Sequence, residues 1–157
     1  MEFWAAFRGI CKNGEWIRGP VVKRHTGFWI ETFSEEKMDY VLNFVRQETI
    51  GECTNMYDQN VKMMYKGDIV RLCGKIIGEI AFEAGAFGIR TKHQPIDYDY
   101  LASEIETITG CPNSPRFCCK DYFVSLHEIY SNYNGEDNIV PLVEIIGNKY
   151  DNPELLK

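Results

Sequence analysis

The chain has 157 residues, a formal net charge of −6 and a high aromatic content of 13%. This length fits one domain, or one small domain with an arm, and suffices to bury a core without disulfides or a metal. The negative charge argues against a nonspecific hold on DNA or RNA, which needs clustered Lys and Arg. The only short basic cluster, Lys23-Arg24-His25, is expected to be a solvated loop.

Targeting signals are not evident in the sequence. The first eleven residues lack the positive start and the long apolar run of a signal peptide, and no stretch approaches the roughly 18 apolar residues of a membrane span. We therefore expect a cytoplasmic protein that does not enter a membrane. In that compartment its six cysteines are expected to be reduced thiols.

The first predicted element is a β-hairpin. The segments Phe7–Lys12 and Glu15–Val22 flank Asn13-Gly14, the pair that a type I′ turn favours because both central residues need positive φ. A third strand is expected at Phe28–Phe33.

The next segment has two interpretations. Met38, Val41, Leu42 and Val45 have helical spacing, with Ser34 as a possible N-cap, whereas the alternation of Tyr40, Leu42 and Phe44 is typical of a strand. We predict a strand at Tyr40–Val45 after an acidic loop.

A tight turn and a β-meander are predicted further along. Gly67 can take positive φ, Asp68 offers a carboxylate to nearby backbone N–H groups, and the β-branched residues that follow begin a strand. Alternation then predicts strands at Ile76–Glu83 and at Phe87–Lys92, joined by the turn Ala84-Gly85-Ala86.

The rest of the chain is predicted to hold one helix and two strands. Leu101, Ile105 and Ile108 have helical spacing after the possible caps Asp97 and Asp99, and Gly110 ends the helix. Strands are expected at Tyr122–Ile129 and Val140–Ile146. In the tail, a turn is expected to bring Leu155 and Leu156 against the body.

Four aromatic residues of the arm, Trp4, Trp16, Phe28 and Trp29, are candidate partner-binding residues. We favour the interpretation that they pack the small sheet onto the body, as buried aromatic rings commonly do. The alternative is a patch that binds a partner, because Trp and Tyr are enriched at binding hot spots.

Cys111, Cys118, Cys119 and His127 are candidate metal ligands, because thiolates and imidazole suit zinc. The paired spacing of structural zinc sites is absent, however, and adjacent cysteines in a strand would point to opposite faces. We predict reduced cysteines and no metal.

Catalytic motifs are not apparent either. His25, His93 and His127 lie in separate segments, with no nucleophile elbow and no His-Glu-x-x-His helix. The run from Gly85 to Gly88 lacks the Lys of a phosphate loop. Asp97 and Asp99 could serve acid–base chemistry only if they lined a pocket. We therefore predict no catalytic residues, no cofactor and no enzyme activity.

Several segments resemble the YopX family of phage and prophage proteins. The ending Glu144–Leu156 resembles the family's carboxy-terminal signature, and Thr49–Thr54 followed by Lys66–Val70 resembles its central motif. Phe7–Gly9 with Asn13–Trp16 is similar to its amino-terminal hairpin. The resemblance implies an SH3-like β-barrel with an N-terminal β-arm, encoded by a phage or prophage. It brings no activity and no catalytic residues.

The chain departs from that family at a few turns. The family has an aromatic residue where Cys53 stands, Gly where Asn55 stands, and an Asn-Gly turn where this chain has Asn60-Val61. The segment 95–122 has no counterpart that we identify.

Taken together, we predict a mainly β fold. An N-terminal β-hairpin arm at 1–47 precedes an SH3-like barrel at 48–157, with one short inserted helix. The expected function is that of a noncatalytic phage accessory protein that binds a phage or bacterial host protein in the cytoplasm. The alternative is a small-barrel module associated with nucleic acid, which the charge disfavours. Homo-oligomerisation through the arm is a further possibility, because exposed strand edges invite pairing.

Overall fold

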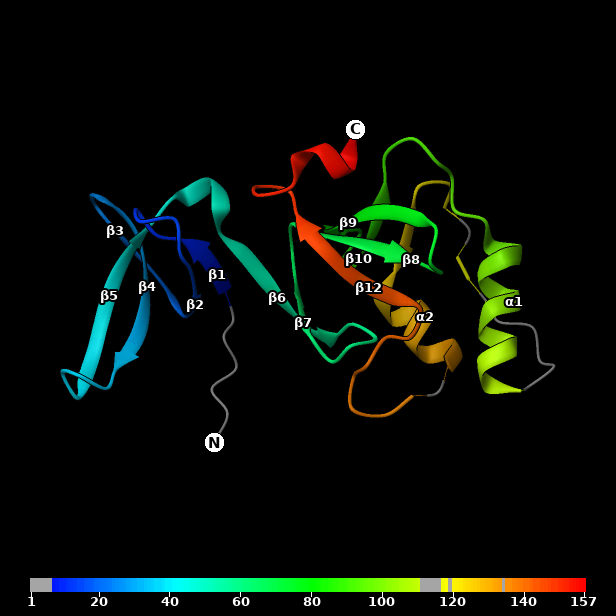
Figure 1. Ribbon diagram of the computed structural model, residues 1–157, viewed down its shortest axis with the longest axis horizontal. Helices are drawn as coiled ribbons and strands as arrows, with labels where there is room; N and C mark the ends of the chain where they lie inside the picture. The colour runs from blue at the N-terminus through cyan, green and yellow to red at the C-terminus, as the bar shows by residue number, and fades with distance from the viewer. Residues whose placement is uncertain (1–6, 111–116, 119, 134) are drawn as a thin grey trace. The chain divides into compact units, whose positions relative to one another are not determined.

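A computed structural model describes residues 7–110, 117–118, 120–133 and 135–157 (Figure 1). The chain divides into two compact units, Met1–Cys53 and Thr54–Lys157. The division lies a few residues after the boundary expected between 47 and 48. The two units are described one after the other.

The first unit begins with the predicted hairpin. Strand β1 (Phe7–Ile10) pairs antiparallel with β2 (Trp16–Gly19) and with the beginning of β6 (Gly51–Tyr57). The turn differs from the expected type I′, because Gly14 has φ +87° but Asn13 does not have positive φ. The amide of Gly14 donates to the carbonyl of Cys11 over 2.9 Å. The loop is thus a turn followed by a left-handed glycine, another common hairpin connection.

A three-stranded antiparallel sheet completes the first unit, in the order β3–β4–β5. Its strands are β3 (Val21–Arg24), β4 (Gly27–Ser34) and β5 (Asp39–Val45). The strand alternative for the ambiguous segment is therefore confirmed. The predicted second hairpin strand, Glu15–Val22, is wrong in extent. Strand β2 ends at Gly19, and after Pro20 the separate strand β3 begins at Val21.

The small core of the first unit lies between these sheets. Ile30 and Val45 are buried, and both would lie within 3.3 Å of a Cβ placed on Gly9, so the strands approach closely only because that residue is glycine. The short η1 helix (Gln47–Thr49) adds the buried Thr49, whose Oγ1 accepts from the Ile10 amide over 2.9 Å.

The second unit contains a five-stranded antiparallel sheet in the order β11–β10–β9–β8–β12. Its strands are β8 (Asp68–Leu72), β9 (Ile76–Glu83), β10 (Ala86–Thr91), β11 (Phe123–Ser125) and β12 (Val143–Asn148). The predicted meander is confirmed. Strand β12 starts later than expected, since Leu142 has φ +68°, which interrupts an extended backbone.

The predicted turn before β8 is also confirmed. It follows the short strand β7 (Met63–Tyr65). Gly67 has φ +96°, and the buried Asp68 carboxylate accepts a hydrogen bond from the Tyr65 amide over 2.7 Å.

Two helices cover the core of this unit, where one was predicted. Helix α1 (Tyr98–Thr109) begins at Asp97, whose carboxylate accepts from the Tyr100 amide over 3.0 Å, and ends at the left-handed Gly110. It buries Leu101 and Ile105 against the sheet residues of the core, among them Ile80.

Helix α2 (Leu126–Tyr133) corrects the strand expected at Tyr122–Ile129. Only β11 is extended there. The amide of Glu128 donates to Ser125 Oγ over 3.0 Å, and the amide of Ser125 donates to Glu128 Oε2 over 3.1 Å. This reciprocal pair is a capping box, which starts a helix.

The tail docks as predicted. Helix η2 (Pro153–Leu156) contacts β9, and Leu155 and Leu156 are partly buried there. The mainly β architecture is thus confirmed, but among the described residues none of the three sheets closes into a barrel. No helix in the described part of the chain is long and apolar enough to cross a membrane.

Candidate functional site

The candidate site is an exposed aromatic surface on the β3–β4–β5 sheet. Because side chains alternate along a strand, the inward Ile30 of β4 leaves its neighbours Trp29, Glu31 and Phe33 on the other side of the sheet. The pairing of β4 with β5 places Trp29 opposite Phe44, Glu31 opposite Leu42 and Phe33 opposite Tyr40. We call these six residues the aromatic face.

The four rings of the aromatic face form two edge-to-face pairs. The centroids of Trp29 and Phe44 are 5.5 Å apart, and those of Phe33 and Tyr40 are 5.4 Å apart. Such cross-strand pairs stabilise a sheet by about 0.2–1 kcal/mol each. They also hold the rings in fixed positions, which lowers the entropy cost of binding a partner.

Three of the four rings remain open to solvent despite these contacts, while Trp29 is half-buried. Phe33 is 52% exposed, Tyr40 55% and Phe44 47%. Buried aromatic residues would explain sheet stability alone, whereas large rings clustered and exposed on one face are typical of an interaction surface. The inner side of the same sheet already supplies its core through Ile30 and Val45.

Charges of opposite sign lie at the two ends of this sheet. Strand β4 spans eight residues, which at about 3.3 Å each is roughly 25 Å. Exposed basic residues lie at one end: Lys23 and Arg24 are the last residues of β3, and Arg46 directly follows β5. The loop expected at Lys23-Arg24-His25 is therefore wrong for its first two residues, which pair with β4. At the other end lie the exposed acidic residues Glu35 and Glu36 of the β4–β5 turn and Asp39 at the start of β5, with the exposed Lys37 among them.

The structure separates the four residues proposed from the sequence. Trp29 lies on the aromatic face. Phe28 points to the opposite side of β4, where the ammonium group of Lys23 lies 5.8 Å from its ring centroid. Trp16 lies on β2, with the guanidinium carbon of Arg8 4.6 Å from its ring centroid. Trp4 lies outside the described residues.

Of the four rings of the aromatic face, three were not predicted from the sequence: Phe33, Tyr40 and Phe44. The sequence does show that Tyr40, Leu42 and Phe44 alternate along one strand, and that Trp29 and Phe33, four positions apart, lie on the same side of another. What was lacking was the register between the two strands, which brings these sets to one face.

Two of the described cysteines, Cys11 and Cys73, do not resemble nucleophiles. Burial, and then the charge of Glu104, raises the pKa of the Cys73 thiol to about 12. Burial, followed by the charge of Glu15, also raises the pKa of Cys11. Both therefore stay protonated near neutral pH, and the thiol is the unreactive form.

The considered metal ligands are not brought together among the residues that the structure describes. Cys111 and Cys119 lie outside them. The amide of Cys118 donates to Glu128 Oε1 over 2.6 Å, and His127 Nε2 lies 3.1 Å from Ser131 Oγ. Within the described ranges, no group of three or more His, Cys, Asp or Glu residues is placed to hold a metal ion.

Comparison with known proteins adds no family assignment. No family model matches the chain, and no curated protein matches it significantly. The resemblance to YopX proteins therefore stays a prediction from the residues that carry it.

Proposed function

We propose that this protein is a noncatalytic binding module that docks another protein on the aromatic face. The observation that carries the proposal is the cluster of exposed rings on one side of a sheet whose other side already forms a core. Aromatic residues dominate the binding energy of many interfaces, where the partner's surface shields their rings from water.

The charges around the face suggest the partner's chemistry. A matching surface has an apolar strip with an acidic group beside Arg24, which shares the parity of Trp29, and basic groups beside Glu35 and Glu36. Such complementarity speeds association and sets orientation more than it adds affinity. Glu31 lies near the middle of β4, so two copies paired symmetrically at that point would bring two carboxylates together. This favours a different protein as the occupant.

The wider setting of the proposal follows from the resemblance. A YopX-like chain would act in the cytoplasm of a bacterium that carries the phage, and its partner would be a phage or host protein. In that reading the Gly67-Asp68 turn and the meander that follows correspond to part of an SH3-like barrel. The turn geometry and the order of β8, β9 and β10 are compatible with such a relationship.

The test compares capture of proteins by matched surface variants. The variant F33S/Y40S removes one ring pair from the aromatic face. The control F82S removes the exposed ring of an edge-to-face pair in the second unit, where the centroids are 5.0 Å apart and Phe82 is 48% exposed. Each immobilised protein is incubated with lysate of the source cells, and bound proteins are quantified by mass spectrometry.

The expected result is a partner that binds the unaltered protein and the control, and is recovered at least tenfold less with F33S/Y40S. The affinity of the purified partner is then measured by calorimetry. Equal recovery by both variants would contradict the aromatic face as the docking site. Turnover of a substrate by the purified protein would contradict the noncatalytic function.

A further inference from the structure

A groove in the second unit lies between the tail and the outer side of the five-stranded sheet. It has a volume of about 390 Å³ and is lined by Glu79, Arg90, Thr91, Lys92, Tyr122 and Leu156. A smaller hollow of about 190 Å³ shares Lys92 and Leu156 with it and adds Lys75, His93 and Lys157. We call the two together the tail groove.

The fold brings distant segments together to build this groove. Glu79 on β9 lies directly opposite Arg90 on β10. The amide of Thr91 donates to the Tyr122 carbonyl over 2.9 Å, which fixes Tyr122 beside the end of β10. The tail is held by Lys149, whose amide donates to the Gly67 carbonyl over 3.0 Å.

The acidic charge in the groove is already matched. The Nζ of Lys149 lies 3.1 Å from Glu79 Oε1. Burial alone would lower the pKa of Lys149, but the hydrogen bond and the charge of Glu79, together with those of Tyr150, outweigh it and raise that pKa. Lys149 therefore stays charged, and Glu79 contributes little net negative potential to the groove.

The remaining cations leave the groove positive. Arg90 is paired with Glu83, its Nε donating to Oε2 over 2.9 Å, and Lys75 lies over the ring of Tyr100 at 3.5 Å from the centroid. Lys92 and Lys157 are exposed, and neither makes an ion pair among the described residues. A positive groove is unexpected in a chain whose formal net charge is −6.

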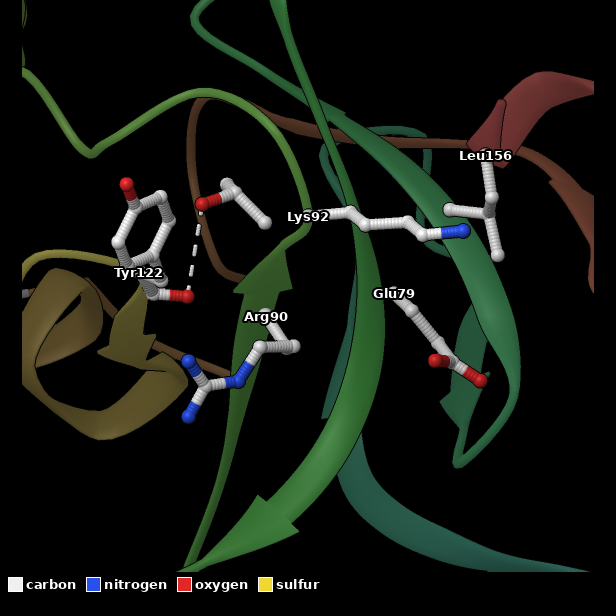
Figure 2. Close-up of a pocket in the computed structure, with 6 residues that line it drawn as sticks. Glu79, Arg90, Lys92, Tyr122 and Leu156 are labelled. Carbon is white, nitrogen blue, oxygen red and sulfur yellow. Dashed lines mark hydrogen bonds between the residues drawn. The ribbon is translucent and has the colours of Figure 1, made fainter.

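The groove also offers apolar and aromatic surface. Figure 2 shows Lys92 extending toward Leu156, with Arg90 and Tyr122 at the other end of the groove. Tyr122 is 41% exposed. An exposed ring beside cations is the combination by which proteins hold a nucleotide, since the ring stacks on the base and the cations attract the phosphate.

We propose that the tail groove binds a nucleotide unit, with its phosphate near Lys92 and its base against Tyr122. This site is separate from the aromatic face and does not depend on the proposed protein docking. The same chemistry occurs in free mononucleotides and in single-stranded nucleic acid. The volume is within the range of about 300–1,000 Å³ that is usual for small-ligand pockets.

The test uses fluorescein-labelled oligo(dT) of twelve nucleotides and the full chain, measured by fluorescence anisotropy at several salt concentrations. We expect saturable binding that weakens as salt increases, because phosphate contacts release counterions. K92E is expected to weaken binding by about tenfold or more. K62E is the matched control, since it makes the same charge change at an exposed lysine in the 58–62 turn, outside the groove lining.

A second variant tests the base contact. Y122L is expected to weaken binding of the oligonucleotide by about tenfold, as loss of one stacking contact commonly does, while circular dichroism shows an unchanged fold. Competition with unlabelled ATP distinguishes a site for free mononucleotides from a site for single-stranded nucleic acid. Displacement by ATP identifies a mononucleotide site, and displacement only by unlabelled oligo(dT) identifies a single-strand site; either outcome supports the proposal.

Three results would overturn it: no binding of oligo(dT) or ATP at low salt, an equal effect of K92E and K62E, or displacement by poly-glutamate as effective as that by oligo(dT). The last two would show that only general attraction of polyanions is present. Because the aromatic face is left intact in all of these variants, failure here leaves the protein-docking proposal untouched.

Discussion

At the scale of single residues, a buried aspartate connects two distant parts of the second unit. Asp58 is fully buried, and its Oδ1 accepts from the amides of Asn60 and Lys62 over 2.9 Å each. Its Oδ2 accepts from the amide of Ile145 on β12, also over 2.9 Å. One carboxylate thus closes a turn and satisfies a backbone donor on the edge strand of the sheet.

We expect D58A to lower the free energy of unfolding by about 2–4 kcal/mol, measured by urea denaturation. A buried unpaired donor costs about 1–3 kcal/mol; the amide of Ile145 is half-buried, whereas the amides of Asn60 and Lys62 lie in an exposed turn and lose less. D58N should be less harmful, because the amide oxygen still accepts. Q59A in the same turn is the control, since Gln59 is exposed. A loss under about 1 kcal/mol for D58A would show that water replaces the carboxylate.

The roles of single residues were predictable only where the chemistry is local. The Gly67-Asp68 turn was predicted from the two residues themselves, and in the structure the Asp68 carboxylate accepts from the amide of Tyr65, three positions before it. Asp58 could not be singled out, because its partner Ile145 is 87 positions away. Nothing in the local sequence shows that this carboxylate is buried.

At the scale of secondary-structure elements, the change from β11 to α2 occurs within two residues. The extended Ser125 is followed at once by the helical Leu126. Ser125, Leu126, His127 and Glu128 match the capping-box pattern, in which a Ser side chain and a Glu side chain satisfy each other's amides.

We expect S125A to lower the free energy of unfolding by about 0.5–2 kcal/mol, since it removes the acceptor for the Glu128 amide. Far-ultraviolet circular dichroism should show less helix as well. S131A is the matched control, because Ser131 lies on the exposed side of the same helix. If S125A and S131A had equal effects, the capping box would not determine where α2 starts.

Helices and strands were predicted correctly where the spacing of apolar residues and the residues that cap or end an element indicated the same structure. Helix α1 has apolar spacing, an aspartate cap and a terminal glycine, and all three are present in the structure. Helix α2 has only eight residues, too few for apolar periodicity to outweigh the β preference of Phe123 and Val124. The cap was its only clear signal. The aromatic face depends on register between strands, which periodicity within one strand does not supply.

At the scale of the whole molecule, the two units have unequal cores. Of the buried apolar residues in the described part of the chain, only Ile10, Ile30, Val45 and Cys53 belong to the first unit. The large cluster that includes Met64, Ile80 and Leu126 belongs to the second. Because apolar burial is the main source of stability, the second unit is expected to be the more stable one.

We therefore expect a fragment of residues 51–157 to unfold cooperatively at the same urea concentration as the main transition of the full chain. A fragment of residues 1–53 is expected to be unfolded alone, since a small sheet with few buried side chains is marginal. Tryptophan fluorescence reports on the first unit, because Trp16 and Trp29 lie there. An unfolded 51–157 fragment would contradict this division of stability.

The lower stability expected of the first unit makes binding at the aromatic face detectable by denaturation. A partner that binds only the folded aromatic face stabilises it by mass action, by about 2.7 kcal/mol at a free concentration one hundred times the dissociation constant. Adding the partner should therefore move the tryptophan transition of the full chain to higher urea and leave the main transition unchanged. A nucleotide bound in the tail groove should move the main transition to higher urea and leave the tryptophan transition unchanged. Movement of both transitions by either ligand would show that the two units unfold as one.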